Sequence, residues 1–474
     1  MNDHEWRSMP LNRRSRLPRW FTAVGIVVVA ACTPSATSDV LVRLDVRSTA
    51  TPRPFAVDSR QATCQASMAM EVSLAPPPAS PMPLRGDPQF DPDRLSDAAR
   101  YWYDELWRAL SDADFVEWST RLARRDDVYQ YGRTLHTHIG ALLTAFRVSG
   151  DLALLDEVDR LAEHMRAQLN DGWRSTLDGS NGTRDGYLNW VRRHGDSRQH
   201  QGKDLHVFDE MRTHAVVAEF AWAFHNNRDL TSPNGVPYGE RADVWTSYLV
   251  DHFEKKWRSR NDVPRTQFPF LEHHSLHASV SFVKYHHFVG LILDSAGHRA
   301  EAERLSHRVL DEFVNVTING ETATVWPSWL GADAGENYLQ PSTYVRYVVG
   351  DAVTLHLEGA PRWRESRLID AIAASIREFV LNPRSDDLTF ARDIGGGVAQ
   401  GGIAASPDEF GPFDVNRFAS SSYAAVATWD RTGTIAELTC EIHLQRRERS
   451  PDVHLPSSML LAVAGDDRSR LAAR

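Results

Sequence analysis

Apolar residues recur at helical spacing from about residue 91 to about residue 443, in segments that follow one another in pairs. The first segment of each pair is apolar on nearly every side, as in Ala215–Ala218, and the second carries charge, as in Glu301–Arg304. A helix that is apolar all round is buried, and a charged amphipathic helix covers it. The expected pairs are 129–149 with 152–169, 209–225 with 241–257, 272–295 with 299–314, 342–357 with 364–381, and 416–429 with 432–444.

These pairs, together with an opening pair near residues 95–124, predict an inner ring and an outer ring of helices. The expected fold is therefore all-α, an α/α toroid that is either complete or incomplete. A small β-hairpin interrupts it, because residues 315–318 and 321–326 flank Asn319-Gly320, and Asn-Gly between two alternating runs is the strongest short-range hairpin signal. We expect the hairpin between two repeats, as a wall of the cleft.

Residues 1–31 have the three parts of an export signal: a basic stretch, an apolar run from Phe21 to Ala31, and a small-residue cleavage site. The apolar run is about half of the roughly 20 residues that a bilayer core demands. The tetrapeptide that ends at Cys32 resembles the bacterial lipobox. This resemblance implies that Cys32 becomes the first mature residue and carries a lipid anchor in the membrane. The alternative is an ordinary soluble secretory signal.

The rest of the chain divides by composition into three parts. Residues 32–86 are rich in Ser, Thr, Ala and Pro and predict a disordered tether, residues 87–450 form the toroid domain, and residues 451–474 form a C-terminal tail. This organisation predicts a lipoprotein of the cell envelope, in the outer membrane or the periplasm, or a secreted protein. With Cys32 lipidated, Cys64 and Cys440 remain. An oxidising compartment would permit a disulfide between them, but we expect two unpaired thiols.

The charge balance bears on the partners of the protein. The whole chain has a formal net charge of −10, and removal of residues 1–31, with five arginines and two acids, leaves −13. A strongly acidic chain lacks the basic surface that binds phosphate backbones, so we expect no nucleic-acid partner.

Polar residues gather where the inner helices are expected to begin. Three histidines, His273, His274 and His277, follow Glu272 at the start of one such helix. The spacing of His273 and His277 is also that of a zinc pair, but no third ligand is indicated and His274 stands where a zinc protease needs glutamate. We therefore expect no metal. The other starts contribute Asp209, Glu210, Arg212 and His214; Tyr338, Gln340, Tyr344, Arg346 and Tyr347; and Asp414, Asn416 and Arg417.

Aromatic residues in the expected loops suggest a surface for sugar rings. Trp190 and Trp326 lie in loops near these helix starts, where an indole can stack on a sugar face. Their alternative role is to pack helices together, as tryptophans in helices commonly do.

Arginine, histidine and tyrosine together favour one reaction. Cleavage of a uronate chain by β-elimination requires a neutralised carboxylate, removal of the proton beside it, and protonation of the departing glycosidic oxygen. Arginine can stabilise the charge that builds up on the carboxylate. Histidine or tyrosinate can accept the proton, and tyrosine can protonate the leaving oxygen.

The paired-helix pattern, the export signal and the segments Glu272–His277 and Tyr338–Tyr347 resemble the toroidal polysaccharide lyases, in particular the alginate and glucuronan lyases. The resemblance covers roughly residues 90–445. It implies a cofactor-independent enzyme whose partner is an acidic polysaccharide. In several such families an Asn-His pair opens one inner helix, and an Arg and a Tyr come from the next.

This resemblance implies that His273, His274, Tyr344 and Arg346 are the catalytic residues. Two departures stand out, since His273 replaces the amide and Arg346 follows the tyrosine instead of preceding it by about two turns. Arg212 is a competing group for carboxylate neutralisation, and Tyr338 is a competing acid. The residues expected to bind substrate are Glu210, Arg212, His214, His277, Tyr338, Trp190 and Trp326.

Two other functions remain open. A glycoside hydrolase on the same toroid would need two carboxylates that flank the scissile bond, and Asp209, Glu210, Glu272 and Asp414 are the candidates. A noncatalytic lipoprotein that binds glycans at the cell surface would need neither the lyase residues nor the pair of carboxylates.

Overall fold

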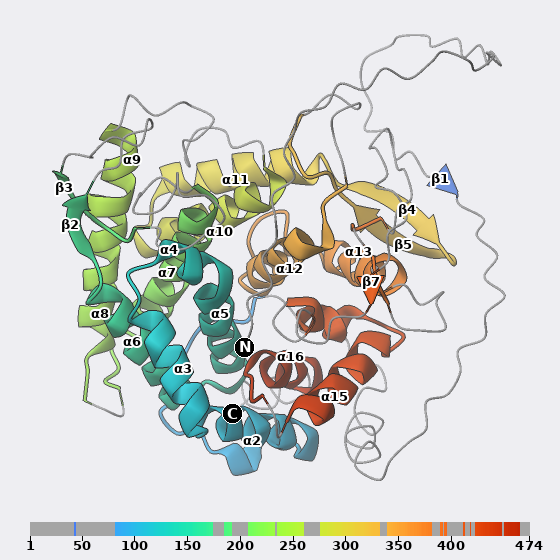
Figure 1. Ribbon diagram of the computed structural model, residues 1–474, viewed down its shortest axis with the longest axis horizontal. Coiled ribbons are helices and arrows are strands. Elements are labelled where there is room, and N and C mark those ends of the chain that lie inside the picture. Colours follow the sequence, from blue (N-terminus) through green and yellow to red (C-terminus); the bar gives the residue numbers. More distant parts are fainter. Residues whose placement is uncertain are drawn as a thin grey trace.

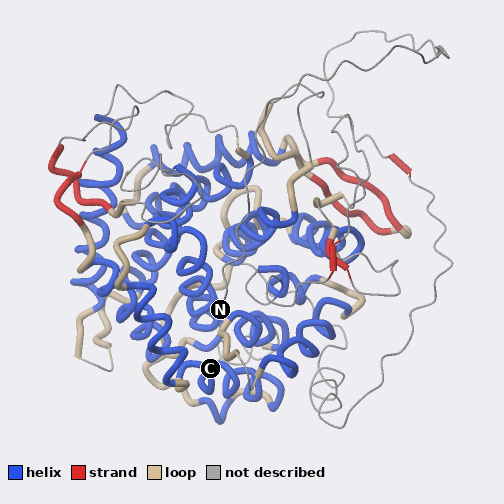
Figure 2. Tube along the Cα trace, viewed as in Figure 1, coloured by secondary structure: helices blue, strands red, loops and turns tan. Residues whose placement is uncertain are grey.

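The computed structural model describes residues 42–43, 81–173, 184–191, 207–232, 235–259, 275–331, 339–381, 389–391, 393–395, 411–412, 418, 422–447 and 450–464. Helices make up most of this part of the chain, and the few strands lie at its edges (Figures 1 and 2). The all-α class expected from the sequence is confirmed. None of the described helices is long and apolar enough to cross a membrane.

The helices follow the expected pairs closely. The opening pair is α2 (Asp97–Leu110) with α3 (Ala113–Ala123). The others are α5 (His136–Ser149) with α6 (Leu152–Arg166), α7 (Val207–Asn226) with α8 (Tyr238–Ser247), α10 (Leu276–Ile292) with α11 (Ala296–Leu310), α12 (Ser342–Leu357) with α13 (Ser366–Ser375), and the 3₁₀ helix η7 (Ser422–Trp429) with α15 (Thr434–Arg446).

Short helical segments extend several of these elements. A 3₁₀ turn, η1 (Pro92–Arg94), precedes α2, and α4 (Val128–Gln130) with the π-helix η2 (Tyr131–Leu135) leads into α5. The helix α8 continues through the π-helix η4 (Tyr248–Glu254) into α9 (Lys255–Ser259), and α13 continues into the π-helix η6 (Ile376–Val380).

The turn between α5 and α6 shows how the sequence encodes one pair. Gly150 adopts a left-handed conformation with φ of 73°, which ends α5 at a residue without a Cβ atom. The next residue, Asp151, accepts a hydrogen bond from the backbone N–H of Ala153 and so caps the start of α6. A left-handed glycine followed at once by an N-cap reverses the chain within two residues.

The apolar helices pack against one another in the interior. Helix α5 contacts α7, α7 contacts α10, and α10 contacts α12; α12 then contacts η7, η7 contacts α16 (His454–Val463), and α16 contacts α5. Buried charges join these helices at their centre. Lys284 Nζ lies 2.7 Å from Glu219 Oε2 and 3.2 Å from Asp351 Oδ1, so one ammonium compensates carboxylates from two neighbouring helices.

The predicted C-terminal boundary of the helical domain, at residue 450, lies too early, because residues 451–474 are not simply a tail. They include α16, whose residues Leu455, Met459 and Leu460 are fully buried. The run is short, ten residues, and contains Pro456 in its first turn, so the sequence gives little helical period to recognise. Proline is tolerated there because the first turn needs no backbone donor.

The N-terminal boundary also changes. Met82 and Leu84, within the expected tether, are buried, and Met82 N–H donates to the Leu357 carbonyl at 2.6 Å. The strand β1 (Val42–Arg43) pairs in parallel with β4 (Val314–Ile318). The expected signal of residues 1–31 and Cys32 lie outside the described residues.

The hairpin is confirmed: β4 pairs in antiparallel register with β5 (Glu321–Val325), Ile318 opposite Glu321. Asn319 and Gly320 have φ of 50° and 84°, the left-handed pair that such a two-residue turn requires. Two small sheets were not expected: β2 (Asn170–Trp173) with β3 (Arg184–Asn189), and β6 (Thr389–Phe390) with β7 (Gly411–Pro412).

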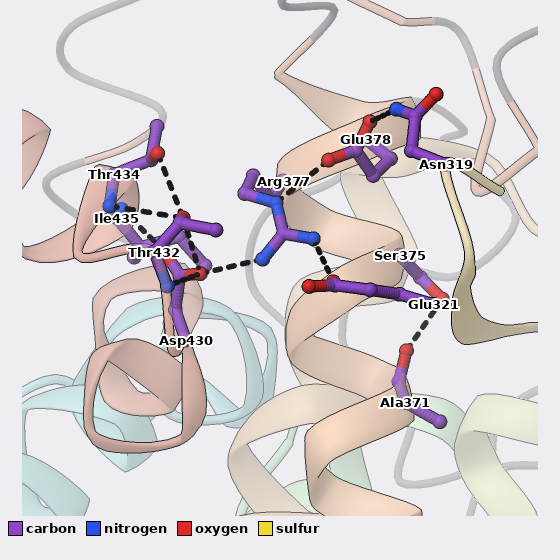
Figure 3. A network of polar contacts seen from close by, with 10 residues as sticks. All are labelled: Asn319, Glu321, Ala371, Ser375, Arg377, Glu378, Asp430, Thr432, Thr434 and Ile435. Carbon is purple, nitrogen blue, oxygen red and sulfur yellow. Dashed lines mark hydrogen bonds and ion pairs between the residues drawn. The ribbon is translucent and has the colours of Figure 1, made fainter. Parts of the chain in front are cut away.

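Arg377 ties the hairpin to the helices (Figure 3). Its guanidinium pairs with Glu321 of β5, with Glu378 at 2.7 Å, and with the fully buried Asp430 at 2.7 Å. Asp430 also accepts the backbone N–H of Ile435 at 2.8 Å and so holds the start of α15. One arginine therefore joins β5, η6 and the loop before α15.

Cys440 in α15 corrects another expectation. It is 1% exposed and disulfide-bonded, where an unpaired thiol was expected. The remaining cysteines of the sequence, Cys32 and Cys64, lie outside the described residues.

Candidate functional site

Arginines from three segments surround one tyrosine at the N-terminal ends of the inner helices. Arg212 of α7 places its Cζ 3.8 Å from the ring centroid of Tyr347. Arg346, the preceding residue on α12, lies 4.7 Å from the same centroid and donates from Nη2 to the Tyr347 hydroxyl at 2.7 Å. Arg133 of η2 completes the group, which we call the arginine cluster: Arg133, Arg212 and Arg346.

The arginine cluster changes the acidity of the enclosed phenol. Tyr347 is 4% exposed, and burial by itself would raise its pKa. The positive charges of Arg212, Arg346 and Arg133, with the hydrogen bond from Arg346, outweigh burial and lower the pKa of Tyr347 below its ordinary value. The site therefore favours the phenolate, which is a proton acceptor.

The cluster carries more positive charge than its protein partners neutralise. Within the described residues its carboxylate partner is Asp209, 3.3 Å from Arg133 Nε and 3.6 Å from Arg212 Nη1. Arg212 is 2% exposed, yet its Nε and Nη2 have no hydrogen-bond partner in the described part of the chain, and neither has Arg346 Nε. Buried guanidinium N–H groups without acceptors are suited to an anionic ligand.

A second group of rings adjoins Tyr347. The imidazole of His277 stacks on Tyr344 with centroids 4.7 Å apart, and its Nδ1 is 2.8 Å from the Ser275 hydroxyl. On the other side, the ring of His136 lies 5.5 Å from that of Tyr347. Burial first, and then the charges of Arg212, Lys284 and Arg346, lower the pKa of His136 well below its ordinary value, so this imidazole is neutral at neutral pH.

A close backbone approach brings the first arginine into place. A Cβ atom on Gly132 would lie 2.5 Å from the Asp209 carbonyl oxygen, so only glycine allows η2 to pack this closely against the start of α7. The π-helical turn then carries Arg133 to Asp209. Local π-helical geometry is frequent at functional sites, although η4 and η6 show that it also occurs elsewhere in this chain.

Four residues expected from the sequence come together here: Arg212, Arg346, Tyr344 and His277. The expected catalytic residues His273 and His274, the competing acid Tyr338, and the carboxylates Glu272 and Asp414 lie outside the described residues.

Glu210 and His214, expected to bind substrate, are packing residues instead. The Glu210 carboxylate is 1% exposed, 3.1 Å from Lys256 Nζ, and accepts a hydrogen bond from the Trp257 indole at 2.9 Å. His214 is 2% exposed, with ring nitrogens 2.6 Å from the Glu210 carbonyl and 2.9 Å from the Tyr248 hydroxyl. The polar atoms of both side chains thus contact neighbouring helices, in contrast to Arg212 of the same helix, whose Nε and Nη2 have no partner among the described residues.

The two tryptophans expected to stack on sugars are also buried. Trp190 is 1% exposed, packs edge-on against Tyr131, and donates to the Met165 carbonyl at 2.9 Å. Trp326 is fully buried and stacks on Phe313 with centroids 4.8 Å apart. Neither indole has a free face, so the packing role that the sequence left open is the correct one.

A different tryptophan is exposed beside the site. Trp329 is 41% exposed and forms an isolated antiparallel bridge with Ser275, the residue whose hydroxyl holds His277. Its neighbour Ser328 accepts the backbone N–H of Leu276 at 3.0 Å. Trp329 thus lies next to the start of α10, at the edge of the ring group formed by His277 and Tyr344.

Sequence reasoning passed over Arg133, His136 and Tyr347 as site residues. Tyr347 stands in the same helix start as Arg346 and was available to the same argument. Arg133 and His136 lie near the start of the helix predicted at residues 129–149, from which no site residue was predicted. The signal was therefore present, but the choice among several tyrosines and arginines needed their distances.

Among the described residues, no group of three or more histidine, cysteine or acidic side chains could hold a metal ion. No protein-family model matches this chain, and comparison with curated proteins and with solved structures gave no match.

Proposed function

We propose that this protein is a polysaccharide lyase that cleaves a uronate-containing polysaccharide, of the alginate or glucuronan class, by β-elimination. The observation that carries the proposal is a buried tyrosine of lowered pKa enclosed by three arginines, two of which have N–H groups without acceptors among the described residues. An anionic sugar needs such donors, and proton abstraction needs such a base.

The geometry supports a division of roles. Arg212 and Arg346 hold the substrate carboxylate and stabilise the charge that develops on it. The Tyr347 phenolate takes the proton from the carbon beside that carboxylate, a double bond forms, and the bond to the glycosidic oxygen breaks. Tyr344, stacked on His277, is the group that protonates the departing oxygen. His273 and His274 remain candidates on the strength of the sequence resemblance.

We further propose that the fold is an α/α toroid. The supporting observation is that contacts among the inner helices pass from α5 through α7, α10, α12, η7 and α16 and return to α5. The charged helices α6, α8, α11, α13 and α15 each contact an inner partner. In this arrangement the N-terminal ends of the inner helices face a common space.

Trp329 is the sugar-stacking residue in this proposal. It is the exposed tryptophan nearest to His277 among the described residues, and an indole face can cover the apolar side of a pyranose ring. Trp329 thus takes the sugar-stacking role that the sequence analysis predicted for Trp190 and Trp326.

We also propose export to the cell envelope, with anchoring through Cys32. The disulfide at Cys440 supports an oxidising compartment, because cytoplasmic proteins rarely keep such bonds.

The hydrolase is the less favoured enzyme. Of its four candidate carboxylates, the two described ones, Asp209 and Glu210, are fully buried and engaged by Arg133 and Lys256. An acid and a base that flank a glycosidic bond need access to it.

The test is ultraviolet absorbance of the unsaturated uronate product, with protein lacking residues 1–32 and with alginate, glucuronan and glycosaminoglycans as separate substrates. We expect a rise on one of them and its loss in Tyr347→Phe. New reducing ends without the absorbance would establish hydrolysis. Binding without cleavage would establish the glycan-binding protein.

A further inference from the structure

A polar cavity lies directly behind Tyr347. It has a volume of about 70 Å³, is partly open to solvent, and is lined by residues of α5, α10, α12, η7 and α16. Tyr347 and His136 of the candidate site line it, together with Lys284, Ser422 and Ser457. A buried water needs roughly 10–15 Å³ of such space, so the cavity has room for several.

A glycine keeps this space open. Gly140 lies in the middle of α5 and lines the cavity, and a Cβ atom added to it would meet nothing within 4 Å. Glycine inside a helix costs roughly 0.5–1 kcal/mol relative to alanine. The chain thus keeps a residue that weakens an inner helix at a position where a larger one would fit.

The cavity wall contains polar atoms that lack protein partners. Ser457 is 1% exposed, and its hydroxyl has no hydrogen-bond partner within the described residues; the same is true of His136 Nδ1. Buried polar atoms of this kind are normally satisfied by ordered water. A dry cavity of this size would instead have apolar walls.

We propose that this cavity is a hydrated chamber through which the proton of Tyr347 exchanges with solvent, an inference that rests on the proposed role of Tyr347 as the base. When Tyr344 protonates the leaving oxygen, Tyr347 ends the reaction as a neutral phenol. Its O–H then donates the proton to a chamber water, the proton passes along the waters to solvent, and the Tyr347 phenolate returns for the next turnover. Tyr344, left as a phenolate when it protonates the leaving oxygen, takes up a proton from solvent, so the cycle balances.

The charged groups around the chamber suit this step. The arginine cluster favours the phenolate. Asp351 from α12 is held by Lys284 of α10 at 3.2 Å and by the Ser281 hydroxyl at 2.6 Å. His136 from α5 and His454 from α16 are neutral at neutral pH, since burial lowers the pKa of both. The part of η7 that lines the chamber, Ser422 and Ala425, carries no titratable group.

The test fills the chamber with Gly140→Leu. The matched control is Gly297→Leu, at an exposed position in the outer helix α11 where the nearest atom to an added Cβ is 3.8 Å away. The first readout needs no substrate: the pKa of Tyr347 is measured by phenolate absorbance, as the difference between each protein and its Tyr347→Phe partner. We expect Gly140→Leu to fold and to raise this pKa by about one unit, because water that solvates the phenolate is displaced.

The second readout is turnover on the polymer that the wild type cleaves. We expect kcat to fall about tenfold in Gly140→Leu with KM unchanged and a larger solvent hydrogen isotope effect, because proton return becomes limiting. A leucine variant that is more stable, with an unchanged Tyr347 pKa and unchanged kcat, would mean a dry cavity and overturn the proposal. A wild type that cleaves no uronate overturns the proposed function instead, and the pKa readout still decides whether the chamber is hydrated.

Discussion

Tyr347 shows how a few charges decide the chemistry of one side chain. A buried phenol is ordinarily a weaker acid than one in water, because the phenolate loses its solvation. Here Arg212 and Arg346 supply positive charge at 3.8 and 4.7 Å from the ring centroid. Their attraction for the phenolate outweighs the loss of solvation, so the pKa of Tyr347 is lowered instead of raised. The direction of that pKa shift sets the pH range in which the proposed base is ready.

Removal of Arg346 should therefore move the pH profile. Because Arg346 lowers the pKa of Tyr347, Arg346→Ala raises it, so the phenolate forms only at higher pH. We expect the acidic limb of kcat/KM to shift upward by about one pH unit. The same substitution at Arg364, an exposed residue before α13, is the control. A profile that loses amplitude without shifting would contradict the role of Arg346 in tuning the base.

Trp329 gives a second prediction at this scale. Trp329→Ala removes an exposed indole at the edge of the site, so we expect KM to rise about tenfold while kcat changes little, with partial recovery in Trp329→Phe. Leu293→Ala, equally exposed at the end of α10, should leave both constants unchanged. An unaltered KM in Trp329→Ala would remove this residue from the substrate site.

At the scale of elements, the β4–β5 hairpin shows how a local signal and a distant contact combine. Asn319-Gly320 sets the turn, but the position of the hairpin depends on Arg377 of η6 and Asp430 before α15 (Figure 3). A buried ion pair does not by itself add much stability, whereas loss of one partner leaves the other charge buried and unpaired.

Arg377→Leu should therefore be severely destabilising. We expect a loss of about 3–5 kcal/mol in the free energy of unfolding, measured by denaturant titration, because Asp430 is fully buried and would lose its cation. Arg304→Leu, in an exposed pair with Glu301 on α11, should cost about 0.5 kcal/mol or less. Similar losses in both variants would show that the Arg377 network contributes no more than a surface pair.

At the scale of the whole molecule, burial of histidines makes the fold sensitive to acid. His138 is fully buried against Phe115 and Trp118, its ring nitrogens lack partners within the described residues, and burial lowers its pKa to about 3. His287 is likewise lowered to about 4. The unfolded chain binds protons at these positions near pH 6.5, while the folded chain does not.

The free energy of unfolding should consequently be free of this histidine penalty above pH 6.5 and should fall as the pH decreases toward 3. Each such histidine costs about 1.4 kcal/mol per pH unit in this window. His138→Leu should lose less stability than the wild type between pH 6.5 and 5, measured by thermal or denaturant unfolding. Parallel pH curves for the wild type and His138→Leu would contradict this.

Net charge gives a further prediction at this scale. The chain has a formal net charge of −10 and repels an anionic polymer at long range, and salt screens this repulsion beyond a Debye length of about 10 Å at 0.1 M. We expect kcat/KM on the polyuronate to fall at very low salt. A value that climbs steadily as salt is removed would mean that the arginine cluster dominates the approach.

The sequence by itself determined what depends on neighbours along the chain. Helix pairs followed from apolar periodicity, the α5–α6 turn from Gly150-Asp151, and the β4–β5 hairpin from Asn319-Gly320, because each is settled within a few residues. Arg212, Arg346, Tyr344 and His277 could be predicted as site residues because each stands near the expected start of an apolar helix.

Only the tertiary structure decided which groups touch. Trp190 and Trp326 looked like loop residues, but their indoles are covered by rings from distant segments, and α16 is a helix because α5, α2 and η7 bury it. Tyr347 lies at the centre of the site because two packed segments bring arginines to its ring. Gly132 lets η2 pack against the start of α7, α7 supplies Arg212, and Asp209 of α7 holds Arg133 of η2. Electrostatic tuning depends on distances between segments far apart in sequence, and those distances exist only once the helices have packed.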